Sequence, residues 1–66
     1  MKVWINGEIA EVNGVTNVAG LAAHYGLQPN AVLIEHNKTA LHRREWAERK
    51  LAEGDRIEFV RVVAGG

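Results

Sequence analysis

Two glycines at the end of the sequence carry its most distinctive chemistry. Gly65-Gly66 directly follows an apolar stretch at 57–64, so the last group is an α-carboxylate on a thin segment. Glycine has no Cβ and can enter a slot that is too narrow for any other residue. A carboxylate on such a tail can be threaded into the active site of another enzyme and activated there as an acyl group. The alternative is an ordinary frayed terminus, because chain ends are usually poorly ordered.

The remaining side chains do not form a recognisable catalytic or metal-binding set. Serine and cysteine are absent, which excludes a serine nucleophile, a disulfide and a cysteine-based metal site. His24, His36 and His42 lack metal-ligand spacing and fall in different predicted elements, so we expect no metal site. Two acidic residues near the last predicted strand are expected to form surface ion pairs worth at most about 1 kcal/mol: Asp55 and Glu58, with Arg56 or Arg61.

The length and composition predict one small domain. Sixty-six residues bury only about 60% of the surface that the unfolded chain exposes. With 47% hydrophobic residues and no cross-link, packing alone must hold the fold, and a stability of roughly 3–5 kcal/mol is expected. Such a domain is too small to enclose a deep catalytic pocket. This favours a carrier or a binding module over an enzyme.

The charge pattern argues against nucleic acid and membrane partners. Eight basic and eight acidic residues give a net charge of zero, without the basic surface that phosphate backbones require. The densest positive stretch, 42–44, is followed at once by Glu45 and Glu48. No apolar run is long enough to cross a bilayer, and the first residues lack signal-peptide architecture. We therefore expect a cytoplasmic protein.

The first half of the chain predicts a hairpin followed by a helix. Alternating residues at 2–5 and 8–12 flank Asn6-Gly7, the strongest short signal for a two-residue hairpin turn. Thr16 or Asn17 can cap the helix, and Gly26 is placed to end it. The helix should pack on the sheet through four residues at helical spacing: Val18, Leu21, Ala22 and Tyr25.

The second half predicts further strands and a short helical segment. These elements are a strand at 31–36, a tight turn at 37–38, a strand at 39–41, a helical segment at 43–50 anchored by Trp46, a turn at 53–56 and a last strand at 57–63. A hairpin, one helix and further strands make an α+β fold with the helix across one face of a mixed sheet. We expect the first and last strands to be parallel neighbours at its centre.

Strand alternation predicts what lies on the uncovered face. Val3 and Ile5 share one face of the first strand, so Trp4 points the other way. By the same parity Val60 and Val62 point away from the helix. These three residues would form an apolar patch for a partner, unless loops cover Trp4 or a bulge shifts the parity near Val60.

Over its whole length the chain resembles the ThiS family of ubiquitin-like β-grasp proteins. The resemblance rests on the opening strand and Asn6-Gly7, the stretch 37–46, the stretch 53–58 and the ending Ala64-Gly65-Gly66. The family often has an Asn-Gly turn, a Pro-Arg pair and a Trp. Asn37, Arg43 and Trp46 fit this pattern. Lys38 stands where Gly is usual and His42 where Pro is usual, so the turn at Asn37 is expected to be less tight than in relatives.

The resemblance implies a protein co-substrate, not an enzyme. Residues 1–63 would form the β-grasp domain and 64–66 a flexible tail. An E1-like adenylyltransferase would use ATP to adenylate the Gly66 carboxylate, and a persulfide from a cysteine desulfurase route would convert it to a thiocarboxylate. That group would donate sulfur to thiazole synthase in thiamine biosynthesis. The chain itself would bind no cofactor and would be a monomer when free.

Other functions use the same tail. One is a sulfur carrier for molybdopterin synthesis or tRNA thiolation. Another is a ubiquitin-like modifier in which Gly66 forms isopeptide bonds with lysines, and a third is a β-grasp module that only binds. The compact length and the Arg43–Trp46 pattern favour thiamine biosynthesis.

Overall fold

The computed structural model describes residues 1–61, which form five strands, one α-helix and one 3-10 helix. The elements in chain order are β1 (Lys2–Ile5), β2 (Glu8–Glu11), α1 (Val18–His24), β3 (Val32–His36), β4 (Thr39–Leu41), η1 (Arg43–Glu45) and β5 (Arg56–Arg61). β5 begins one residue earlier than predicted. The last two residues of the predicted strand, 62 and 63, lie outside the described part.

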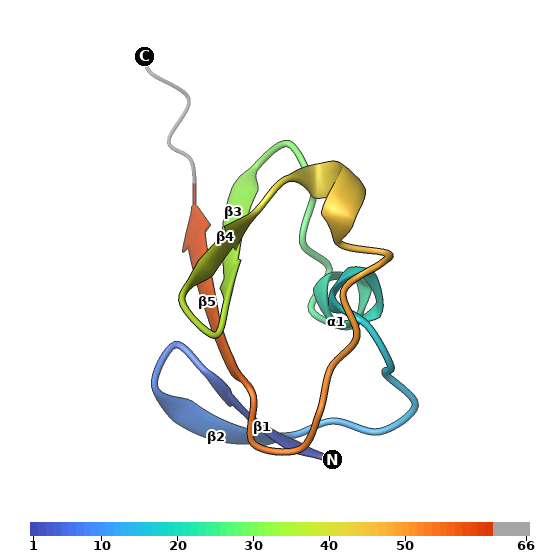
Figure 1. The fold of residues 1–66 in the computed structure, drawn as a ribbon, viewed down its shortest axis with the longest axis vertical. Helices are drawn as coiled ribbons and strands as arrows, with labels where there is room; N and C mark the ends of the chain where they lie inside the picture. Colours follow the sequence, from blue (N-terminus) through green and yellow to red (C-terminus); the bar gives the residue numbers. More distant parts are fainter. Residues whose placement is uncertain (62–66) are drawn as a thin grey trace.

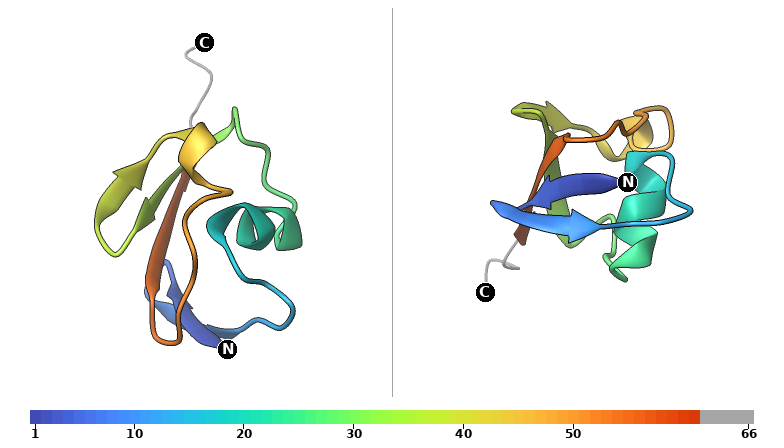
Figure 2. Two further views of the ribbon diagram at one scale, coloured as in Figure 1. Left: turned by 45° about the vertical axis from the view of Figure 1, so that its right-hand side comes forward. Right: turned by 90° about the horizontal axis from the view of Figure 1, so that it is seen from below.

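The strands form one mixed sheet in the order β2-β1-β5-β3-β4 (Figure 1). β1 and β5 run parallel, with Trp4 opposite Arg56, and the other strand pairs are antiparallel. The prediction that the first and last strands are neighbours at the centre of the sheet is therefore confirmed. α1 and the segment that leads into β5 lie on one side of this sheet, and the opposite face is open (Figure 2).

Both hairpins turn through two residues with positive φ. Asn6 and Gly7 have φ of 50° and 85°, as a type I′ turn requires. Asn37 and Lys38 have φ of 50° and 72°, so the second turn is as short as the first. The tight turn predicted at Asn37-Lys38 is confirmed, and Lys38 adopts the left-handed conformation that glycine would adopt more easily.

Local hydrogen bonds set both ends of α1. The Asn17 Oδ1 accepts a hydrogen bond from the Gly20 amide at 2.7 Å, which identifies Asn17 rather than Thr16 as the N-cap. Gly26 has φ of 68°, and its amide and that of Leu27 donate to the carbonyls of Ala23 and Ala22. This is the Schellman arrangement, and it confirms Gly26 as the residue that ends the helix.

The core lies between the sheet and α1. Val18, Leu21 and Ala22 are buried as predicted. Tyr25 is not: it follows the last helical residue and is 42% exposed, with its ring edge-on to Phe59 at 5.9 Å. The buried face of the helix therefore ends at Ala22, one turn earlier than predicted. The remaining buried apolar residues are Val3, Val12, Val15, Val32, Ile34, Leu41, Trp46, Leu51 and Ile57.

The segment predicted to be helical at 43–50 forms only the single 3-10 turn η1 followed by turns. Its anchor Trp46 is buried, as predicted. The backbone of this segment pairs with the start of α1 instead of continuing as a helix: the Val18 amide donates to the Arg49 carbonyl and the Ala19 amide to the Trp46 carbonyl. Within residues 1–61, no helix is long and apolar enough to cross a membrane.

Candidate functional site

The predicted reactive group lies beyond the described residues. β5 is described to Arg61, and Gly66 follows five residues later. The predicted tail residues Ala64, Gly65 and Gly66, together with Val62 of the predicted patch, all lie outside residues 1–61. Five residues fully extended span at most about 18 Å. An enzyme that acts on Gly66 must therefore come within that distance of the end of β5.

Trp4 lies on the open face of the sheet, as the strand parity predicts. It is partly buried, and the Arg56 guanidinium carbon lies over its ring at 5.3 Å from the centroid. Ile9 of β2 stands opposite Trp4 and is 59% exposed. These contacts come from three neighbouring strands. Because the Arg56 stem and charge cover part of the indole, Trp4 presents an amphipathic surface instead of a purely apolar one.

A second apolar group lies on the same face, close to the end of β5. Val60 is 50% exposed and pairs directly with Leu33 of β3, which is 59% exposed. The sequence analysis did not name Leu33. Its position between the buried Val32 and Ile34 was the available signal, because alternate residues of a strand face opposite sides.

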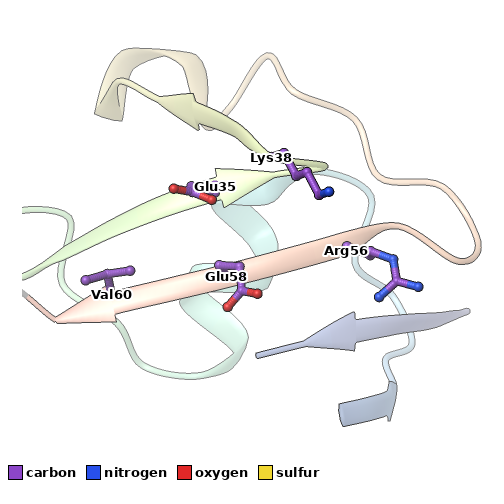
Figure 3. A pocket seen from close by; sticks show the side chains of 5 residues that line it. All are labelled: Glu35, Lys38, Arg56, Glu58 and Val60. Carbon is purple, nitrogen blue, oxygen red and sulfur yellow. The ribbon is translucent and has the colours of Figure 1, made fainter. Parts of the chain in front are cut away.

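Charged side chains separate the two apolar groups. Trp4 is level with Arg56, so Val60 lies four residues farther along β5, or about 13 Å. Arg56 and Glu58 occupy the intervening open-face positions, and with Glu35, Lys38 and Val60 they line a shallow pocket (Figure 3). The prediction of one continuous apolar patch was therefore wrong for Trp4 and Val60, although both residues do lie on the open face.

A largely buried hydrogen bond below this face was not anticipated. Asp55 was expected to pair with Arg56 or Arg61, but its Oδ2 lies 2.7 Å from the Nε2 of His36, and both side chains are largely buried. The Asp55 carboxylate also accepts hydrogen bonds from the Ala52 amide at 2.8 Å and the Asn37 side-chain amide at 3.1 Å. Because an ionised carboxylate only accepts, the His36 Nε2 is the donor. This arrangement fixes the turn before β5 against the end of β3.

The electrostatics of Asp55 follow from this geometry. Burial raises the pKa of the Asp55 carboxyl, but the hydrogen bonds from His36, Ala52 and Asn37 outweigh burial, so that its pKa is lowered overall. At η1, the hydrogen bond from the His42 amide to Glu45, at 2.7 Å, lowers the pKa of that carboxyl. These carboxylates stabilise turns. Neither lines the shallow pocket of the open face.

Residues 1–61 contain no group of three or more histidine and acidic side chains that could hold a metal ion. His36 is engaged with Asp55, whereas His24 stacks edge-on against Tyr25. The described part of the chain therefore offers a contact surface beside the end of β5, and no constellation for general acid–base or metal chemistry.

Sequence comparison identifies the family. The model of the ThiS family matches residues 3–66, nearly the entire chain. The chain belongs to the ThiS family.

Solved structures support this assignment. The crystal structure of the thiamine biosynthesis protein (ThiS) from Geobacter metallireducens superposes with a TM-score of 0.83 at 30% identity, over 100% of both chains. The solution structure of a thiamine biosynthesis protein from the same organism gives a TM-score of 0.82 at 29% identity, over 100% of this chain and 88% of the other. The five-stranded mixed sheet with one helix is thus the ubiquitin-like β-grasp fold expected from the sequence.

Two curated relatives are much longer than this ThiS-family chain. A thiazole synthase of Magnetococcus marinus is 35% identical over 66 residues, and a thiazole synthase of Paramagnetospirillum magneticum is 29% identical over 66 residues. Each match covers 100% of this chain and 20% of the relative. The chain therefore spans about a fifth of the length of these relatives.

Proposed function

We propose that this chain is the sulfur carrier of thiazole formation in thiamine biosynthesis, with the Gly66 carboxylate as the group that carries sulfur. The observation that supports this most directly is the ThiS-family match, which continues through Gly65 and Gly66. The two thiazole synthases support the choice of acceptor. In each, a segment like this chain is part of the same polypeptide. Joining two components raises their effective concentration for each other, which benefits components that act together.

The thiocarboxylate forms in three steps. A carboxylate is a poor electrophile, so an E1-like adenylyltransferase first joins Gly66 to the α-phosphate of ATP and releases pyrophosphate. The terminal sulfur of a persulfide, supplied by a cysteine desulfurase, then attacks the acyl carbon and displaces AMP. Cleavage of the resulting acyl disulfide by a thiol leaves the thiocarboxylate on Gly66. The thiocarboxylate is an ionised, soft nucleophile that can pass its sulfur to thiazole synthase.

The domain contributes reach and a docking surface. Gly66 lies within about 18 Å of Arg61 along the chain, so a partner that holds Gly66 must approach the end of β5. The open face of the sheet includes Val60 near that end, and we assign partner contact to Trp4 and Val60 on this face and, from strand parity in the sequence, to Val62, which lies outside the described residues. Exposed Leu33 beside Val60 enlarges the apolar part of this surface. Apolar and aromatic residues at such surfaces often supply most of the binding energy.

Mass spectrometry of the intact protein tests the function. The chain is incubated with ATP, the adenylyltransferase, a cysteine desulfurase and cysteine, and we expect the mass change of one oxygen replaced by sulfur at Gly66. Deleting Gly66, or replacing Gly65 by valine, should abolish this change without unfolding the domain. A β-branched side chain both stiffens and widens a segment that must enter a narrow channel.

The competing functions give different results in the same experiment. A ubiquitin-like modifier would form adducts of high mass on lysines, and a module that only binds would show no mass change. A carrier for molybdopterin synthesis or tRNA thiolation would also gain sulfur, so a second incubation adds thiazole synthase, to which such a carrier would not deliver its sulfur. An unmodified Gly66 with active partner enzymes would refute the proposal.

A further inference from the structure

The central strand β5 has one side without a neighbour between the end of β1 and the tail. The last residue pair of the β1–β5 ladder is Ile5 and Ile57, after which β1 turns into the first hairpin. β5 continues past that hairpin to Arg61 (Figure 1). On its other side it stays paired with β3 as far as Arg61. Within residues 1–61, no strand pairs with the β1 side of residues 59–61, which we call the unpaired edge.

The main-chain groups on the unpaired edge follow from the hydrogen bonds just before it. The Asn6 amide donates to the Ile57 carbonyl at 2.9 Å, and the Asn6 Oδ1 accepts from the Phe59 amide at 2.8 Å. Alternate residues of a strand direct their main-chain groups to the same side. The next groups on the β1 side are therefore the Phe59 carbonyl and the Arg61 amide, which lie beyond the last rung that the first hairpin supplies.

The two outer edges of the sheet are protected, unlike the unpaired edge. β2 begins and ends with glutamate, and β4 has only three residues. Charged residues and short strands are common ways to prevent an edge from pairing with another chain. The unpaired edge instead has apolar side chains on both faces. Val60 lies on the open face and is 50% exposed, whereas Phe59 lies on the α1 side, against the ring of Tyr25.

The position of the unpaired edge restricts its occupant. Arg61 is followed by the five residues that end at Gly66, so an enzyme that holds Gly66 comes within about 18 Å of this edge. The tail itself is a poor occupant. To fold back onto β5 it would need a two-residue turn with positive φ, and the valines at 62 and 63 disfavour such a turn because they are β-branched. A main-chain edge is completed by another extended main chain.

We propose that the enzyme that adenylates Gly66 adds an extended segment of its own chain to the unpaired edge of β5. This inference rests on the proposed function, in which that enzyme meets the tail while it still ends in a carboxylate. One residue of the added segment, running parallel to β5, continues the ladder of β1. Its N–H donates to the Phe59 carbonyl, and its C=O accepts from the Arg61 amide. Apolar side chains of the segment pack beside Val60 on one face and Phe59 on the other.

Amide hydrogen exchange of the full chain tests the proposed contact. Exchange is followed by NMR for the chain alone and with an excess of the adenylyltransferase encoded in the same genome, without ATP so that Gly66 does not react. We expect exchange of the Arg61 amide to slow by at least about tenfold in the complex, because a hydrogen-bonded amide exchanges only when it opens. The Glu11 amide, on the outer edge of β2, is the control and should exchange at the same rate in both samples.

Two substitutions at Arg61 separate the main-chain bond from the side chain. Arg61→Pro removes the amide hydrogen, whereas Arg61→Ala removes the side chain and keeps that hydrogen. The Arg61 amide faces away from β3, and proline is tolerated at such a position, so both variants should fold. We expect Arg61→Pro to bind the adenylyltransferase about tenfold more weakly than Arg61→Ala, because it leaves a main-chain acceptor of the enzyme unpaired. Urea unfolding checks the fold of both, and if Arg61→Pro is unfolded, hydrogen exchange of the wild type decides.

Three results overturn the inference. The first is an Arg61 amide that exchanges at the same rate with and without the adenylyltransferase, and the second is equal affinity of the folded proline and alanine variants. The third is exchange of this amide that slows as the concentration of the free chain rises, since a second copy of the chain would then be the occupant. If wild type gains sulfur at Gly66, these results leave the proposed function standing. A wild-type chain that binds the adenylyltransferase and never gains sulfur refutes the proposed function itself.

Discussion

His36 and Asp55 are joined by a 2.7 Å contact between Nε2 and Oδ2, which connects the end of β3 to the residue just before β5. Around it, Asn37 donates from its side-chain amide to Asp55 and accepts from the Arg56 amide. The turn of the second hairpin and the start of β5 are thus fixed to each other by side chains as well as by the ladder. This arrangement positions Arg56 on the open face.

Asp55 should make the stability of the domain sensitive to acid. Its pKa is lowered in the folded state, so its contribution is complete above its unfolded pKa of about 3.9 and is lost as pH falls through the lower folded value. Asp55→Asn should cost about 1–3 kcal/mol at pH 7, as for hydrogen bonds to a charged group. Urea unfolding of both proteins at pH 7 and pH 3 should show a difference that narrows at pH 3. A difference of equal size at both pH values would contradict this account.

Leu21 should be essential to the core. It is fully buried between α1 and the sheet, and Leu21→Ala should cost about 2–5 kcal/mol, enough to unfold much of a domain this small. Leu33→Ala is the control, because Leu33 is exposed and its loss should cost less than about 1 kcal/mol. Urea denaturation followed by circular dichroism measures both. Similar losses for the two variants would mean that α1 does not pack as described.

The two hairpin turns should respond oppositely to exchange of their second residue. Lys38→Gly should stabilise the domain by up to about 1 kcal/mol. Glycine adopts the left-handed conformation at φ 72° without the steric cost that the Cβ of lysine brings. Gly7→Ala should destabilise the domain by about 1 kcal/mol, because alanine rarely adopts a φ of 85°. A new Cβ would meet no atom within 4 Å, so the backbone conformation is the only cost. Thermal unfolding checks both. A stabilising Gly7→Ala would show that the first turn relaxes to another type.

The two tryptophans should separate binding from folding. Trp46 is buried, and Trp46→Ala should cost about 3–5 kcal/mol and melt the domain. Trp4 lies on the open face under Arg56, so Trp4→Ala should retain the circular dichroism of wild type and weaken partner binding. Far-ultraviolet spectra and affinity for thiazole synthase are the measurements. Loss of folded structure in Trp4→Ala would place this residue in the core.

Sequence patterns predicted most of this fold because its signals are local. Each of these signals depends on hydrogen bonds between residues that are close in the sequence. The structure contains all three: the turn at Asn6-Gly7, the N-cap at Asn17 and the helix end at Gly26. Tyr25 shows the limit of this approach. The helical spacing of apolar residues continues to Tyr25, but the Schellman hydrogen bonds at Gly26 end the helix at His24, before Tyr25. The spacing of apolar residues does not predict the residue at which capping hydrogen bonds end a helix.

Longer-range pairings could not be predicted in this way. The segment after Arg43 has helical composition, yet its backbone groups pair with the start of α1, about 30 residues earlier. Likewise, His36 and Asp55 are 19 residues apart, and only the β3–β5 ladder brings them together. Strand parity placed Trp4 and Val60 on the correct face, but it could not give the register, which inserts Arg56 and Glu58 between them.

The central position of β5 has a consequence for synthesis on the ribosome. Within the described sheet, β5 alone joins the β1–β2 hairpin to the β3–β4 hairpin, and its pairing of Trp4 with Arg56 closes a loop of more than 50 residues. Until β5 emerges from the exit tunnel, the two hairpins share no ladder, and isolated two-stranded hairpins are marginal in water. We therefore expect the sheet to be completed only when β5, the last of the described strands in chain order, has emerged.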